Sequence, residues 1–243
     1  MAGVDFREAG HLPNRRQGPY DSAHLPRQRR GVTPQMVGRY PDFDVLDTVD
    51  TWDETTRRAV LQRLQPYGPL RFFAAEEEAT LRALCDTLTD QHAEPRVPVA
   101  EMVDAKFADG KLDGYQHADM PDDRDVWHIV LRGVDEVARR RYGREFARLD
   151  VESRDGICQD FSEGLLQGGV WDEISAKKAF SVVMRAVAAE FYSHPWAWNE
   201  IGFGGPAYPR GFARFGAMSA REGFEKPEAF QQDPVRDVES RHE

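Results

Sequence analysis

Apolar residues recur along most of this chain at the spacing of an α-helix. In one stretch, Leu81, Leu84, Cys85 and Leu88 fall on a single helical face. Similar stripes predict helices over residues 52–65, 74–90, 98–110, 127–141, 150–168 and 172–192. No alternating apolar run is long enough to indicate a β-sheet. We therefore expect an all-α fold, a compact helical bundle of about five to six helices with long non-helical arms at both ends.

Residues beside these stripes indicate where the helices begin. Thr51 to Glu54 has the pattern of a capping box, in which the Thr51 oxygen accepts a backbone N–H and Glu54 reaches back. Asp150 can cap the helix that follows it, and Pro98 suits a first helical turn.

The two ends of the chain differ in composition from the helical part. Arg, Pro and Gly are frequent near the N-terminus, and the C-terminus is polar. We expect an extended arm over residues 1–45, a helical domain over 46–225 and a disordered tail over 226–243. Tyr40 and Phe43 are spaced aromatic residues in the arm, so they are candidates for docking onto a partner.

The charge balance excludes some classes of partner. The 243 residues carry a formal net charge of -10, which disfavours nucleic acid and anionic lipid surfaces. No run approaches the roughly 20 apolar residues that cross a bilayer, so we expect no membrane insertion. No apolar stretch follows the basic residues near the N-terminus, and we expect a cytoplasmic protein unless a partner carries it out. Cys85 and Cys158 lie on apolar helix faces, so we expect reduced, buried thiols.

Patterns for cofactors and metals are incomplete in this sequence. Residues 202–205 are rich in glycine, but the chain has no GxGxxG after a strand and no GxxxxGK[ST], so we expect no cofactor in it. Asp125 and His128 resemble half of a di-iron carboxylate pattern, which needs Glu-x-x-His on two helices. We expect Asp122, Asp123 and Asp125 to cap the following helix and no metal to bind there.

The sequence also shows no recognisable pair of catalytic groups. The chain has no GxSxG motif, and sequence neighbours such as Ser193 and His194 rarely face each other as nucleophile and base. We interpret His194 as a cap at the end of the long helix, where a positive charge suits the helix dipole. Glu200 could serve as a general base, but no second placed group accompanies it.

The segment from Ser193 to Phe212 reads SHPWAWNEIGFGGPAYPRGF. Because Gly and Pro break helices and strands, we expect neither a helix interior nor a central strand here. In one interpretation an Ω-type loop covers the end of the bundle and its aromatic rings fill the core. In the other, the rings form an interface, where Trp, Tyr and Arg commonly dominate the binding energy. The candidate interface residues are His194, Trp196, Trp198, Asn199, Glu200, Phe203, Tyr208 and Arg210, with Tyr40 and Phe43 from the arm.

This segment resembles the C-terminal signature of the gluconate 2-dehydrogenase subunit 3 family. Upstream stretches agree with it: FFAAEEEATLRALCDTL, EMVDAKFADGKLDGY, and FARLDVESRDGICQDFSEGLLQGGVWD leading into AFSVVMRAVAAEFYSHP. The resemblance runs from Arg71 to Phe212 and is most specific in the aromatic segment.

The resemblance implies an accessory role. Such proteins are the small subunits of heteromeric flavin-dependent sugar and sugar-acid dehydrogenases. The large subunit is a flavoprotein of the glucose-methanol-choline type that carries FAD and oxidises the alcohol, and a cytochrome or another acceptor protein takes the electrons. The small subunit holds no cofactor and supports the folding, stability and often the export of the large one. We therefore expect a non-catalytic subunit in a heterodimer with an FAD-dependent large subunit, acting in sugar metabolism.

The sequence departs from this family in one respect. Many such small subunits begin with a twin-arginine export signal, which is not seen here, so we expect a cytoplasmic complex or export on a partner's signal. Two other functions stay open. One is a stand-alone helical module that binds carbohydrate or protein through the aromatic segment. The other is an enzyme with its own activity at His194, Glu200 and Tyr208.

Overall fold

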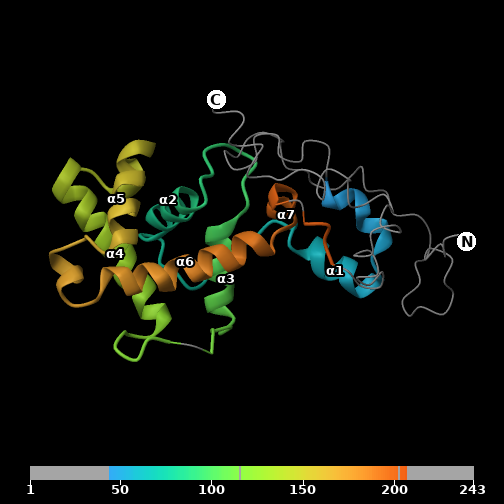
Figure 1. The fold of residues 1–243 in the computed structure, drawn as a ribbon, viewed down its shortest axis with the longest axis horizontal. Coiled ribbons are helices and arrows are strands. Elements are labelled where there is room, and N and C mark those ends of the chain that lie inside the picture. Colours follow the sequence, from blue (N-terminus) through green and yellow to red (C-terminus); the bar gives the residue numbers. More distant parts are fainter. Residues whose placement is uncertain (1–43, 115, 202, 207–243) are drawn as a thin grey trace, which may run out of the picture. The chain divides into compact units, whose positions relative to one another are not determined.

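The computed structural model describes residues 44–114, 116–201 and 203–206 of the chain. All regular structure in these residues is helical and no strand occurs among them, which confirms the all-α fold (Figure 1). The described elements, with 3-10 helices labelled η, are η3 (Val45–Thr51), α1 (Glu54–Gln62), α2 (Glu78–Leu88), α3 (Val99–Ala108), α4 (Asp123–Tyr142), η4 (Phe146–Arg148), α5 (Val151–Glu163), η5 (Gly169–Asp172), α6 (Ala176–Ser193) and α7 (Pro195–Ile201).

The described residues group into two compact units. Unit 1 comprises the described parts of 1–66, 93–97 and 192–243, and unit 2 those of 67–92 and 98–191. Of the arm expected over residues 1–45, only Asp44 and Val45 are described, and the tail over 226–243 lies wholly outside the described residues. The domain bounds therefore stay predictions.

Unit 2 is built around α2 and α4. Helix α2 packs against α3, α4, α5 and η4. Helix α4 buries the whole stripe expected from its sequence, which consists of Trp127, Val130, Leu131, Val134 and Ala138. Cys85 and Cys158 are free and buried, as expected, and burial raises the pKa of the Cys158 thiol to about 12.

Unit 1 has its own small core. The buried apolar residues of this core come from η3, the residue after it, α1 and α7: they are Val45, Leu46, Val49, Trp52, Val60 and Trp198. Leu61 and Leu64 pack against this group from α1 and the turn after it. Burying these side chains is what holds the short helices together, because helices of this length are marginal by themselves.

Aspartate side chains start several of the helices. Asp150 accepts a hydrogen bond from Ser153 N at 2.8 Å and caps α5, as expected. Asp122 accepts one from Arg124 N at 3.0 Å and caps α4, which begins at Asp123 rather than at residue 127. The cap expected at Thr51 is wrong, because Thr51 ends η3 and the Asp53 carboxylate caps α1 instead.

Other helices are shorter than the apolar pattern predicts. Helix α5 ends at Glu163, where Gly164 takes a left-handed backbone with φ 78° and stops the helix before residue 168. Helix α6 begins at Ala176, because residues 169–172 form the separate 3-10 helix η5. Every helix in the described part of the chain is too short or too polar to cross a lipid bilayer.

Candidate interaction surface

The aromatic segment forms a helix at its start. Helix α7 covers Pro195–Ile201, so the expectation that no helix interior occurs in this segment is wrong. The helix is possible because Pro195 occupies the first helical position, where its missing N–H costs no hydrogen bond. The glycines of the segment follow the helix and do not interrupt it.

His194 lies between α6 and α7 and is only 1% exposed. Its Nδ1 atom accepts a hydrogen bond from Trp196 N at 3.2 Å, and its ring meets the Trp196 ring edge-on at 4.9 Å between centroids. Burial lowers the pKa of His194 to about 4, so the imidazole is neutral at neutral pH. The interpretation of His194 as a positively charged helix cap is therefore wrong.

Trp198 belongs to the core of unit 1 and is 6% exposed. Its indole Nε1 donates to the carbonyl of Tyr192 at 2.6 Å, and the Arg63 guanidinium lies over its ring at 5.8 Å. Arg63 also donates to the carbonyl of Ser193 at 2.5 Å, which satisfies the end of α6. Trp198 thus joins the end of α6 to α1.

Asn199 is the second buried anchor of α7. Its Oδ1 accepts a hydrogen bond from Val45 N at 2.7 Å, and its Nδ2 donates to Asp44 Oδ1 at 3.3 Å. These two hydrogen bonds connect α7 with the start of η3. The amide of Asn199 therefore bonds to residues of this chain itself.

Gly205 allows the chain beyond α7 to pass close to η3. Its φ is +79°, and an added Cβ would lie 2.9 Å from Trp52 Cζ2 and from Val45 Cγ2. A side chain at this position would need both an unfavourable backbone and space that the core occupies.

Apolar side chains around Trp198 remain exposed. Tyr192, Ile201 and Phe203 are 42%, 48% and 45% exposed, and we call these three residues the apolar patch. Each is adjacent to Trp198: Tyr192 through its carbonyl, Ile201 one turn further along α7, and Phe203 through an edge-on ring contact at 5.4 Å. Their grouping near Trp198 makes them a candidate interaction surface, whereas exposure alone does not, since Leu165 is 52% exposed.

The candidate interface residues predicted from the sequence differ in burial, and some lie outside the described residues. His194, Trp198 and Asn199 are buried in unit 1, Trp196 is half-buried and Phe203 is exposed. Tyr40, Phe43, Tyr208 and Arg210 lie outside the described residues, and the structure does not describe the side chain of Glu200. Tyr192, Ile201 and Arg63 were missed by sequence reasoning. Ile201 could have been found as the apolar residue one turn after Trp198.

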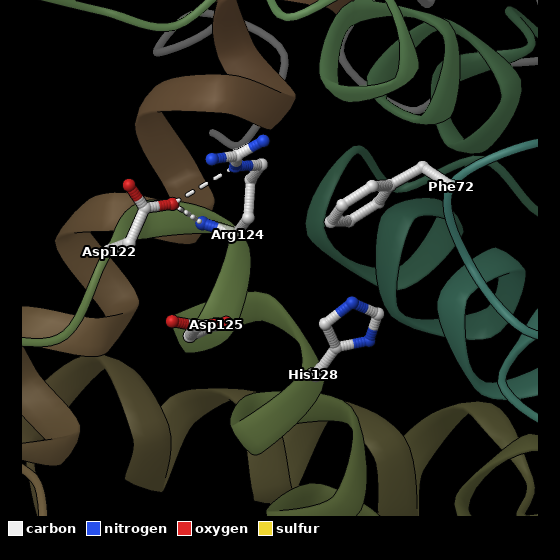
Figure 2. A pocket seen from close by; sticks show the side chains of 5 residues that line it. All are labelled: Phe72, Asp122, Arg124, Asp125 and His128. Atoms are coloured by element: carbon white, nitrogen blue, oxygen red, sulfur yellow. Dashed lines mark hydrogen bonds and ion pairs between the residues drawn. The ribbon is translucent and has the colours of Figure 1, made fainter.

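A separate pocket of about 340 Å³ opens in unit 2 (Figure 2). It is lined by Phe72, Asp122, Arg124, Asp125 and His128. The Asp125 and His128 pair noted in the sequence therefore lies in one hollow. No group of three or more His, Cys, Asp or Glu side chains in the described residues could hold a metal ion.

Comparison with known protein families identifies a match to this chain. The family model described as gluconate 2-dehydrogenase subunit 3 matches residues 75–205, which is more than half of the chain and includes all of α2 to α7. No curated protein and no solved structure matches.

Proposed function

Because the chain belongs to the gluconate 2-dehydrogenase subunit 3 family, we propose that it is a non-catalytic small subunit of a dehydrogenase complex. Its partner would be an FAD-dependent large subunit of the glucose-methanol-choline type that oxidises a sugar, sugar acid or polyol. The small subunit would stabilise and assemble this flavoprotein. The family match over residues 75–205 is the observation that carries the proposal.

The apolar patch supports a contact with another chain. Tyr192, Ile201 and Phe203 are exposed at positions next to Trp198, which itself is held by the Tyr192 carbonyl and by Arg63. Because Trp198 is held in place, the apolar patch beside it loses little conformational freedom when a partner covers it. This small entropy loss favours tight binding. We propose that this patch, together with the half-buried Trp196, contacts the large subunit.

Co-expression with a flavoprotein encoded beside this chain tests the proposal. A stable 1:1 complex with bound FAD in the large subunit is expected. The double variant Ile201→Ala and Phe203→Ala should raise the dissociation constant about 30-fold or more if the patch is the hot spot of the interface, because truncation of a hot spot costs ~2 kcal/mol or more. Both side chains are about half exposed in the free chain, so the variant should fold.

Leu165→Ala provides the matched control. Leu165 is an exposed apolar residue, 52% accessible, that belongs to unit 2, whereas the residues of the apolar patch belong to unit 1. It should leave the dissociation constant unchanged. If no complex forms with the flavoprotein, or if the isolated chain oxidises sugars without it, the small-subunit proposal is wrong. Equal effects of the patch variant and Leu165→Ala would exclude the patch as the contact.

A further inference from the structure

The pocket of unit 2 has a wall that other side chains hold in place. The buried Asp104 carboxylate accepts three backbone hydrogen bonds, from Arg71 N at 2.8 Å, Phe72 N at 2.9 Å and Phe73 N at 3.0 Å. These bonds fix the backbone that carries the Phe72 ring. The ring is therefore positioned before any ligand arrives.

His128 is held beside Phe72 in the same way. Its Nδ1 lies 2.7 Å from Glu77 Oε1, and Glu77 Oε2 accepts a hydrogen bond from Ala74 N at 2.9 Å. The Phe72 and His128 rings lie 4.9 Å apart between centroids, at 34° to each other. Figure 2 shows these two rings together, with Asp122, Arg124 and Asp125 from the start of α4 opposite them.

The charges that line the pocket do not cancel. Asp122 accepts hydrogen bonds from Arg124 N and Arg124 Nε, so these two charges compensate each other. His128 faces Glu77, and this pair is neutral or carries one negative charge, depending on the proton of the imidazole. The exposed Asp125 carboxylate makes no hydrogen bond or ion pair within the described part of the chain. When Glu77, which pairs with His128 but does not itself line the pocket, is counted with the lining residues, their net charge is negative in either state of His128.

A cation with a flat face fits this combination. An aromatic face attracts a cation, and a guanidinium group stacks on such a ring while it pairs with a carboxylate. The volume of about 340 Å³ is at the lower end of the range for small-molecule sites, about 300–1,000 Å³, so one long side chain suits it better than a large cofactor. The net charge of -10 on the chain favours a basic partner surface.

We propose that this pocket binds an arginine side chain of a protein partner, with the guanidinium against Phe72 and paired with Asp125. The identity of the partner as the large subunit rests on the proposed function. The chemistry of the pocket does not, because it follows from the residues of unit 2 alone.

Titration of the full chain with N-acetylarginine amide tests the chemistry. The His128 ring signals, identified by their loss in His128→Gln, should shift and saturate in NMR spectra. The uncharged isostere N-acetylcitrulline amide should shift them little, and N-acetyllysine amide should bind more weakly than the arginine probe. Equal shifts with arginine and citrulline probes would overturn the proposal.

Two matched variants locate the binding group. Asp125→Asn should weaken binding of the arginine probe at least about fivefold, and Asp125→Glu should retain most of it. Asp155→Asn is the control, because Asp155 is also an exposed aspartate near the start of a helix, α5, but does not line the pocket. Unchanged binding by Asp125→Asn, or an equal loss in Asp155→Asn, would contradict the assignment.

The complex with the flavoprotein distinguishes a partner's side chain from a free ligand. Asp125→Asn should weaken the complex about fivefold, whereas Asp155→Asn should not. If the arginine probe binds but the complex is unaffected, the pocket takes a free cation and the partner contact is wrong. If no complex forms at all, the proposed function fails, while the titration still decides whether the pocket binds a guanidinium.

Discussion

Asn199 holds the backbone of Val45, a residue 154 positions earlier in the chain, by a hydrogen bond of 2.7 Å from Val45 N to its Oδ1. The Val45 side chain is fully buried and Asn199 is 8% exposed, so water does not readily replace this bond. Asp44 Oδ1 accepts from both Asn199 Nδ2 and Leu46 N. One amide therefore fixes the start of η3 against α7.

Replacing Asn199 with alanine should destabilise unit 1. The change leaves the Val45 N–H without its acceptor in a buried site, which commonly costs about 1–3 kcal/mol. Urea denaturation should show this loss in the free energy of unfolding. Hydrogen exchange of the Val45 amide should also become faster, because its hydrogen bond is gone.

Gln62→Ala is the control for Asn199→Ala. Gln62 carries the same amide group in the same unit, but its side chain is exposed on α1. Its replacement should change the free energy of unfolding little. If Asn199→Ala unfolds at the same urea concentration as Gln62→Ala, the hydrogen bond to Val45 does not stabilise unit 1.

The connection between Asn199 and Val45 could not be predicted from the sequence. Apolar spacing reports which face of a helix is buried, and it located the stripe of α4 because that helix is long and regular. It does not report which distant segment covers that face. Composition puts Val45 at the edge of an arm predicted to be non-helical, and η3, with 7 residues, is too short to show a repeating apolar stripe.

The helix in the aromatic segment was missed for a different reason. The rule that Gly and Pro break helices does not hold for all of residues 193–212, because Pro195 stands at a permitted position and the glycines begin only at 202. In the pocket of unit 2, the sequence pointed to Asp125 and His128 through their spacing. Phe72 precedes α2 and has no periodic partner, so only the fold places it there.

Two glycines of unit 2 should respond in opposite directions to alanine. Gly133 lies in α4, and a Cβ there would meet Val170 Cγ2 at 2.5 Å and Trp171 Cζ2 at 2.6 Å. Overpacking of this kind costs about 1–3 kcal/mol. Gly156 lies in α5 with nothing within 4 Å of such a Cβ, so alanine should stabilise the helix by about 0.5–1 kcal/mol.

Thermal denaturation gives the melting temperatures of Gly133→Ala and Gly156→Ala, which can then be compared. Alanine has the higher helix propensity at either position, so a lower melting temperature for Gly133→Ala would come from the crowding by Val170 and Trp171. Stabilisation by both changes would show that η5 moves away from α4 at little cost.

Asp104→Asn should destabilise unit 2. The carboxylate accepts from Phe72 N and Phe73 N through Oδ1 and from Arg71 N through Oδ2, and it is 3% exposed. An asparagine can keep one oxygen in place but turns an N–H donor toward the remaining backbone N–H. We expect a loss of about 2 kcal/mol or more in urea denaturation, since hydrogen bonds to a charged group are the stronger ones.

Asp109→Asn is the comparison for Asp104→Asn. Asp109 pairs with Arg71 and Lys111 at the surface, where solvent screens the charges. Its replacement should change the urea midpoint little. An equal effect of the two variants would show that the backbone bonds of Asp104 do not hold the Phe72 segment.

His194 should make the stability of unit 1 depend on pH. Its pKa in the folded chain is lowered to about 4 by burial, whereas an unfolded histidine has a pKa near 6.5. Between these values the unfolded chain binds a proton that the folded chain does not. The stabilisation is therefore complete above about pH 6.5 and is lost as the pH falls to about 4, by up to about 3 kcal/mol.

The variant His194→Gln should flatten this pH dependence. A glutamine oxygen can still accept from Trp196 N, but no proton is taken up on unfolding in this range. Urea denaturation at intervals from pH 4 to 7 gives the free energy of unfolding at each pH. Between about pH 4 and 6.5, the window set by the two pKa values, this free energy should change less with pH for His194→Gln than for the unaltered chain. His92→Gln, which changes a partly exposed side chain, should keep the slope of the unaltered chain. If His194→Gln keeps it as well, another group takes up the proton, and the buried imidazole is not the source of the acid sensitivity.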